Sequence, residues 1–198
     1  MAAPLSLFFH GPLLRPDVVA HMRVDQLANP IPDEAAVLAE VRSWIGALGA
    51  NKALGEAALE QRFNSSILGK VLGYTLFPQE AGTIATAWPK PPARATHLAG
   101  PPDVALGEFD SSSNRFLAVV ELKTPGTNLD APQARVPPLT PIQQAFEYAQ
   151  ALIGVRWVIV SDMRLIRLYE VGDSTSYELF DLQEVPEEAT HWGISTRS

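Results

Sequence analysis

The stretch Pro101–Gly126, PPDVALGEFDSSSNRFLAVVELKTPG, decides the fold that we expect for this chain. Two runs rich in aliphatic and β-branched residues, Val104–Phe109 and Arg115–Leu122, flank the polar cluster Asp110–Asn114. Apolar runs on either side of such a cluster predict a β-hairpin. The second run is almost continuously apolar up to Glu121, which is typical of a strand covered on both faces. The hairpin is therefore expected in the interior of a sheet.

Charged residues lie at the open end of this hairpin. The predicted register pairs Phe109 with Arg115. It places Asp103 directly opposite Glu121, with Cβ atoms about 5 Å apart, and Lys123 shares that face because side chains alternate along a strand. Two carboxylates so close repel each other unless a positive charge lies between them, so the pattern predicts a bound divalent cation. The alternative is that Pro-Asp is an ordinary turn dipeptide and Glu-x-Lys an ordinary solvated strand face.

Composition predicts a soluble, cytoplasmic protein of about one domain. The 198 residues are 46% hydrophobic and 19% charged, which is ordinary for a globular chain. No apolar run approaches the roughly 20 residues of a membrane span, and the N-terminus lacks a basic leader. Cysteine is absent and the four histidines are scattered, so oxygen ligands and hence magnesium or manganese are favoured for any metal. The histidines are His10, His21, His97 and His191.

The net charge of −7, with only 15 Lys and Arg residues, is unfavourable for direct binding to a phosphate backbone. Two interpretations remain open. Either the chain does not bind nucleic acid, or it acts on nucleic acid that another domain or partner delivers.

Two helices are predicted with defined starts. Asp33 is an N-cap for a helix over Glu34–Ile45, whose apolar residues recur at helical spacing. Thr140 is an N-cap with Pro141 at the first helical position, and Gln143 completes a capping box. The stripe expected to be buried on this second helix is Ile142, Ala145, Phe146, Ala149, Leu152 and Ile153. Gln144 and Tyr148, four residues apart, lie on an adjoining face, where they either reach a cleft or are simply exposed.

A further helix is predicted over residues 52–72 and ended by Gly73. Glu60 lies on its apolar side, where a carboxylate needs a partner. That partner is either a metal ion or a neighbouring cation, Arg62 or Lys52, unless Glu60 is simply an exposed residue at the edge of the apolar side.

The remaining elements complete a mixed sheet flanked by helices, an α/β fold. Strands are predicted over residues 74–77, 155–160, 164–169 and 177–180, and long proline-rich loops over residues 78–102 and 124–138.

Pro102-Asp103 with Glu121-Leu122-Lys123, followed by Gln144–Tyr148, resembles the PD-(D/E)xK nuclease superfamily and the Q-x-x-x-Y element of its RecB-type branch. The surrounding segments VELKTPGTNLDAPQ, WVIVSDMRLIRLYE and YELFDL are similar to the N-terminal cleavage domain of type IIG restriction enzymes. The resemblance covers roughly residues 50–183. It implies a restriction-endonuclease-like core with helices on both sides of a mixed sheet.

The resemblance also implies roles for individual residues. Asp103, Glu121 and the Leu122 carbonyl would hold Mg²⁺, for which Mn²⁺ would substitute, and Lys123 would orient or deprotonate the attacking water. Glu60 matches the acidic residue that many members supply from the first core helix, as a further metal ligand. The histidine motif of the RecB-type branch is not evident, so no histidine is assigned.

Gln144 and Tyr148 match the element that positions the metal, the lysine or the scissile phosphate. The chain would then be a magnesium-dependent endodeoxyribonuclease of restriction type, as a fragment or separate subunit, acting on DNA that methyltransferase and target-recognition domains deliver. Dimerisation for double-strand cleavage is compatible with this interpretation.

The implied organisation is an N-terminal helical extension over residues 1–50, a nuclease core over 51–183 and an acidic tail over 184–198. Two rival functions remain: an inactive nuclease-fold module that serves in DNA binding or assembly, and an unrelated α/β domain that binds a protein or a small ligand.

Overall fold

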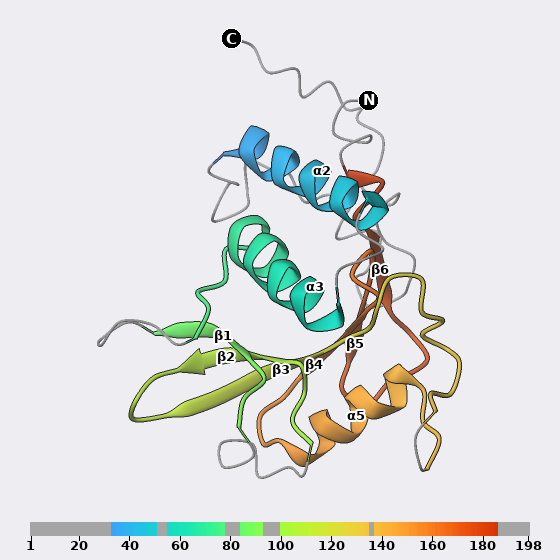
Figure 1. The fold of residues 1–198 in the computed structure, drawn as a ribbon. Helices are drawn as coiled ribbons and strands as arrows, with labels where there is room; N and C mark the ends of the chain where they lie inside the picture. The colour runs from blue at the N-terminus through green and yellow to red at the C-terminus, as the bar shows by residue number, and fades with distance from the viewer. Residues whose placement is uncertain (1–32, 51–54, 78–83, 93–99, 135–136, 186–198) are drawn as a thin grey trace, which may run out of the picture.

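Figure 1 shows the computed structural model of the chain, which describes residues 33–50, 55–77, 84–92, 100–134 and 137–185. The four histidines, Lys52, residues 1–32 of the predicted N-terminal extension and residues 186–198 of the predicted tail lie outside these ranges. No helix within them is long and apolar enough to cross a membrane.

A six-stranded sheet forms the centre of the fold, with the strands side by side in chain order. Only β3 and β4 run parallel, and every other neighbouring pair is antiparallel. The sheet is therefore mixed, as predicted. Its strands are β1 (Ala85–Pro89), β2 (Val104–Phe109), β3 (Asn114–Leu122), β4 (Trp157–Ser161), β5 (Leu165–Glu170) and β6 (Glu178–Asp181).

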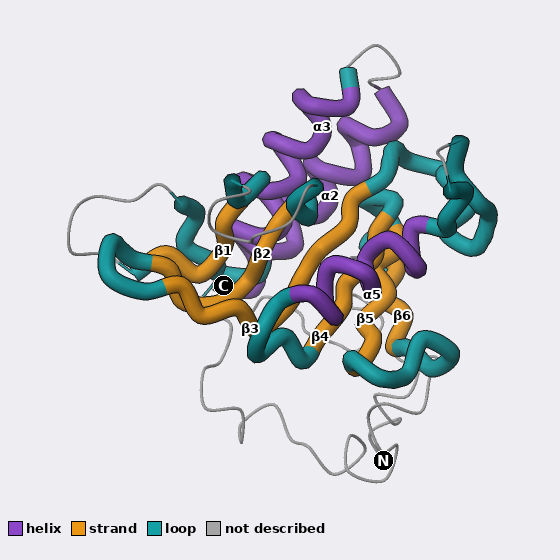
Figure 2. Tube along the Cα trace, turned by 90° about the horizontal axis from the view of Figure 1, so that it is seen from below, coloured by secondary structure: helices purple, strands orange, loops and turns teal. Residues whose placement is uncertain are grey.

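Helices cover both faces of the sheet, so the predicted α/β class is confirmed (Figures 1 and 2). On one face lie α2 (Glu34–Ala50) and α3 (Glu56–Phe63), and α3 continues directly into a π-helical segment, η3 (Asn64–Val71). On the other face lies α5 (Pro141–Ala151). The predicted helix over residues 52–72 is confirmed over its described part and ends before Gly73, whose φ is +74°. Its π-helical second half was not predicted.

Side-chain alternation along β3 fills two separate cores. Val120 and Leu122 belong to the core beneath α2, α3 and η3, whereas Val119 belongs to the core beneath α5. The helix α2 contributes Val41 and Trp44 to the first core. The indole N–H of Trp44 also donates to the carbonyl of Met163, 2.8 Å away, which ties α2 to the turn between β4 and β5.

The β2–β3 hairpin contains a bulge that the sequence did not reveal. Next to the turn, Phe109 pairs with Asn114, so the predicted pairing with Arg115 is wrong by one residue. Leu117 is then left without a partner, and beyond it Val104 pairs with Val120. This later register is the predicted one. A β-bulge inserts one extra residue into one strand, and here it restores the predicted pairing at the open end of the hairpin.

Both predicted helix caps are confirmed. The side chain of Asp33 accepts the N–H of Ala36 at 2.9 Å. Thr140 and Gln143 form the reciprocal capping box, with bonds of 3.1 and 2.9 Å. The predicted buried stripe is wrong at Ile153, which is 95% exposed because the helix ends at Ala151.

Two predictions about residues 74–102 are also wrong. The expected strand over residues 74–77 is reduced to an isolated bridge between Leu76 and Ala87, although Thr75 and Phe77 form backbone hydrogen bonds with β1. The expected loop contains β1, an edge strand whose last residue is Pro89. Proline lacks a backbone N–H and is tolerated at a sheet edge, so the prolines of this segment do not exclude a strand there. The last strands, β4 to β6, lie within two residues of their predicted bounds.

Gly107 lies at the bulge, and we expect Gly107→Ala to destabilise the protein. A Cβ atom there would overlap the carbonyl oxygen of Arg115 on the neighbouring strand. Overpacking of this kind costs about 1–3 kcal/mol, measurable as a lower free energy of unfolding in urea.

Gly46→Ala is the matched control, because no atom lies within 4 Å of its added Cβ. Alanine is favoured over glycine inside a helix by about 0.5–1 kcal/mol, so this variant should be stabilised. Equal stabilities of the Gly107 variant and the wild type would contradict the close approach.

Candidate active site

Two acidic residues lie at the open end of the hairpin, on adjacent strands. Asp103 immediately precedes β2, and continuation of the Val104–Val120 pairing places it opposite Glu121. Its Oδ2 atom accepts the N–H of Leu122 at 2.8 Å. The Asp103 carboxyl therefore bonds to the β3 backbone at the residue that follows Glu121.

Lys123 lies beside Glu121, on the face that strand alternation predicts. Its Nζ atom is 2.6 Å from Oε1 of Glu121, whose side chain is 2% exposed. The N–H of Lys123 donates to the carbonyl of Ser161 at 2.8 Å, so β4 fixes the lysine backbone. Leu122 points to the opposite face and is fully buried in the core beneath α3. The structure thus places an acid and an ammonium group together in a half-enclosed position.

Glu60 reaches the same region from α3. It is buried and forms an ion pair with Lys90, with Nζ 2.6 Å from Oε2. The cation partner is therefore Lys90, and the sequence alternative of Arg62 was wrong. Lys90 itself follows β1, and its N–H donates to the carbonyl of Asp103 at 2.8 Å. Glu60, Lys90 and Asp103 are thereby connected.

Lys90 is the residue that sequence reasoning missed. It stands in Trp88–Pro92, WPKPP, which was interpreted as loop. The only signal for it was the alternation of proline around a single lysine, and this pattern alone indicates no partner.

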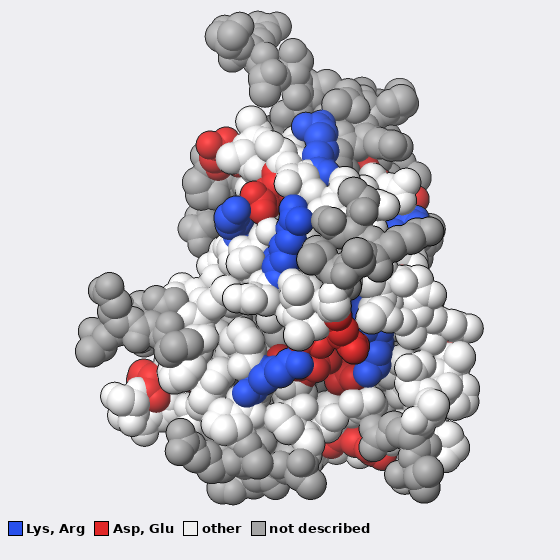
Figure 3. All heavy atoms as spheres, viewed as in Figure 1, with Lys and Arg blue, Asp and Glu red and all other residues white. Residues whose placement is uncertain are grey.

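The acids crowd each other electrostatically. Burial raises the pKa of the Asp103 carboxyl above its ordinary value, and the nearby Glu60 carboxylate raises it further. The bond from the Leu122 N–H and the charges of Lys123 and Lys90 oppose this shift. Figure 3 shows acidic side chains gathered where the lower end of α3 approaches the sheet, with basic side chains on either side.

Gln144 and Tyr148 form a pair on α5. The side-chain amide of Gln144 donates to the Tyr148 hydroxyl at 2.8 Å, and both residues are half-buried. A Cβ atom on Gly100 would lie 3.7 Å from that hydroxyl. The pair therefore borders the segment that leads into Asp103, on the α5 side of the sheet.

The donor atoms suit a hard divalent cation. Within the described ranges, no three Asp, Glu or His side chains form a ready-made metal cluster. Lysines neutralise Glu121 and Glu60, whereas Asp103 has no such ion pair among the residues described. The desolvated Asp103 carboxyl has a raised pKa and lies close enough to Glu60 to be affected by its charge, and carboxylate oxygens are the ligands that Mg²⁺ and Mn²⁺ prefer. Asp103 and Glu121 would hold the ion, and Glu60 could join them only by leaving Lys90.

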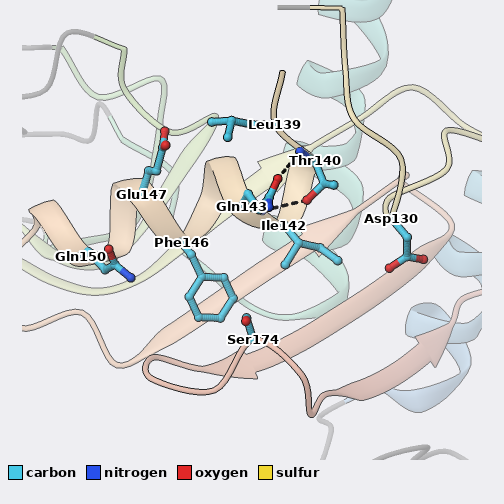
Figure 4. A pocket seen from close by; sticks show the side chains of 9 residues that line it. All are labelled: Asp130, Leu139, Thr140, Ile142, Gln143, Phe146, Glu147, Gln150 and Ser174. Atoms are coloured by element: carbon cyan, nitrogen blue, oxygen red, sulfur yellow. Dashed lines mark hydrogen bonds between the residues drawn. The ribbon is translucent and has the colours of Figure 1, made fainter. Parts of the chain in front are cut away.

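Two surface hollows lie away from these residues. One, of about 500 Å³, borders α5 (Figure 4). Two of its polar groups are already engaged, because Gln143 belongs to the capping box and Asp130 forms two hydrogen bonds with Arg167. The other, of about 990 Å³, lies at the far end of β3 beside Ile153 and Trp157. None of the six predicted catalytic residues lines either hollow.

Comparison with known proteins adds no relative. No family model matches the chain, and neither a curated protein nor a solved structure matches it significantly. The resemblance to PD-(D/E)xK nucleases therefore stays a prediction from the sequence.

Asp103→Asn should raise the free energy of unfolding at pH 7 without added metal. The amide oxygen can still accept the Leu122 N–H, but it carries no charge to bury. A raised folded-state pKa means that the wild type loses stability as the pH rises through that pKa, which lies above the ordinary value of 3.8. The advantage of the variant should therefore disappear below pH 3.8, where the carboxyl is protonated in both states.

Asp173→Asn is the control, and its effect on stability at pH 7 should have the opposite sign. Hydrogen bonds from Thr175 lower the pKa of Asp173 to about 2. The Asp173 carboxylate therefore contributes to folding stability at neutral pH, and this contribution is lost as the pH falls through about 2. This variant should be less stable than the wild type at pH 7. Urea denaturation at several pH values measures both, and an Asp103→Asn variant that is destabilised at pH 7 would contradict the crowding of acids.

Proposed function

We propose that this chain is a magnesium-dependent endonuclease domain that hydrolyses DNA phosphodiester bonds, as the cleavage module of a restriction-modification or phage-defence system. One observation carries the proposal: continuation of the β2–β3 register places Asp103 opposite Glu121, Asp103 accepts the N–H of Leu122, and the ammonium of Lys123 lies 2.6 Å from Glu121. This is the arrangement that the D…E-x-K pattern requires. The mixed sheet with helices on both faces supports it, as a scaffold compatible with a restriction-endonuclease-like core.

Each residue has a task that follows from its position. Asp103 and Glu121 are the proposed ligands of the divalent ion, together with the Leu122 carbonyl. When bound, such an ion stabilises negative charge that develops on the phosphate and lowers the pKa of water. Lys123 projects from the same face as Glu121, and its ammonium orients the attacking water toward the phosphorus. Burial of Glu121 excludes bulk water from one side of the site.

Three residues act around this centre. Glu60 brings a third carboxylate from α3, which would join the ion by leaving its ion pair with Lys90. Gln144 and Tyr148 are joined by a hydrogen bond on α5, which orders both side chains. We assign them the positioning of the scissile phosphate or of Lys123.

The acidity of the chain favours delivery of DNA by other domains. The net charge is −7, and nonspecific affinity for DNA comes from clustered basic residues. Methyltransferase and target-recognition domains would supply that affinity and the sequence specificity. This chain would supply the cleavage chemistry, and a second copy would cut the other strand.

An inactive module for DNA binding or assembly is the second candidate. It is favoured by one observation, namely that Lys123 and Lys90 neutralise two of the three acids without any metal. Cleavage in the presence of Mg²⁺ or Mn²⁺ excludes it. Absence of cleavage, with all six residues intact and partner domains added, would favour it.

Asp103→Ala and Glu121→Ala should each lower metal-dependent cleavage of duplex DNA by at least about 100-fold, because loss of one group that stabilises developing charge has an effect of this size. Cleavage is measured on a duplex oligonucleotide with Mg²⁺ or Mn²⁺, with and without the partner domains.

Glu108→Ala is the matched control. Glu108 is also an acid of this hairpin and pairs with Arg115 at 3.3 Å, but it is exposed and lies at the turn end. Its removal should leave cleavage unchanged. An Asp103→Ala protein that cleaves as fast as the Glu108 variant would refute the assignment.

A further inference from the structure

The backbone of Lys90 is held in an unusual conformation. Its φ is +45°, in the left-handed region that non-glycine residues rarely adopt. Proline flanks it on both sides, and its N–H is bonded to the carbonyl of Asp103 at 2.8 Å. Strained residues persist only where the surrounding structure fixes them, and they concentrate at functional sites. The C-terminal end of β1 therefore fixes the backbone of Lys90 beside Asp103.

Lys90 and Lys123 follow the two outer strands of three neighbours, β1 and β3, and Asp103 precedes the strand between them, β2. Continuation of the Pro89–Val104 pairing places Lys90 opposite Asp103, and Asp103 in turn lies opposite Glu121. Charged residues thus follow one another across three neighbouring strands. Figure 3 shows basic side chains on both sides of an acidic group on this face of the molecule.

The Lys90 ammonium has capacity for another partner. An ammonium group carries three N–H donors, and the ion pair with Oε2 of Glu60 uses one of them. The side chain is 60% exposed, whereas that of Lys123 is 18% exposed. Lys123 is therefore placed to act within the site, and Lys90 faces a ligand that arrives from solvent.

We propose that Lys90 is a substrate-binding residue that contacts a DNA phosphate next to the scissile one, on the side of the acids opposite Lys123. This inference rests on the proposed nuclease function. Three carboxylates repel a polyanion, so a strand can approach them only if positive charge borders the acids on the side of entry. A divalent ion that attracts Glu60 would also free Lys90 to bind the phosphate fully.

The test compares three variants in single-turnover cleavage of a duplex oligonucleotide with Mn²⁺, at several protein and salt concentrations. Lys90→Gln removes the charge and keeps an unbranched polar side chain. Lys90→Arg keeps the charge. Lys70→Gln is the matched control. Lys70 lies on η3, its side chain is 65% exposed, and it pairs with Glu40 of α2 at 3.1 Å. Melting temperatures establish that all variants fold.

Lys90→Gln should raise the half-saturating protein concentration roughly tenfold, as expected for a lost charge-assisted bond, with the maximal rate unchanged. The slope of log affinity against log salt should fall by about 0.9, the value for one phosphate contact with B-DNA. Lys90→Arg should keep the wild-type slope, and Lys70→Gln should behave as wild type.

The two possible failures are distinguishable. A wild-type chain that never cleaves, even with the partner domains added, refutes the proposed function and this inference with it. A wild-type chain that cleaves, with Lys90→Gln indistinguishable from Lys70→Gln, overturns the role of Lys90 alone. A Lys90→Gln variant with a lower maximal rate and an unchanged salt slope also overturns it, since that result indicates a structural role.

Discussion

The structure depends on holding two carboxylates, Asp103 and Glu121, at adjacent strand ends in a partly desolvated position. Charges removed from water are costly unless they are paired or hydrogen-bonded. Here Lys123 compensates Glu121, and the Leu122 N–H compensates Asp103. Burial raises the pKa of Asp103 in spite of the Leu122 N–H and the nearby charges of Lys123 and Lys90. An added cation would compensate the charge of the Asp103 carboxylate, which is why we propose metal-dependent chemistry here.

The bulge at Leu117 is what makes the two acids neighbours. Next to the turn, the hairpin pairs Phe109 with Asn114, and this register continued without interruption would place Asp103 opposite Val120. A slip of one residue moves every side chain of a strand to the other face of the sheet. Glu121 would then point away from Asp103. The extra residue restores the shared face, and the bare backbone of Gly107 permits the close approach of strands that the bulge requires.

The sequence predicted most of the scaffold because local patterns determine it. The turn cluster, the capping box at Thr140 and the apolar run of β3 each carry a physical signal within a few residues, and the corresponding elements are confirmed. The bulge, β1 and the π-helical turn depend on tertiary pairing and were missed. The Glu60–Lys90 ion pair joins residues from α3 and the end of β1, so no spacing rule reveals it. Ile153 was assigned to the core only because its helix was expected to continue.

Anomalous X-ray scattering from a crystal soaked in Mn²⁺ tests the central claim most directly. We expect an anomalous peak between the carboxylates of Asp103 and Glu121, at metal–ligand distance from both, and loss of that peak in a Glu121→Gln crystal. A peak elsewhere, or none at saturating Mn²⁺, would contradict a metal centre at the open end of the β2–β3 hairpin.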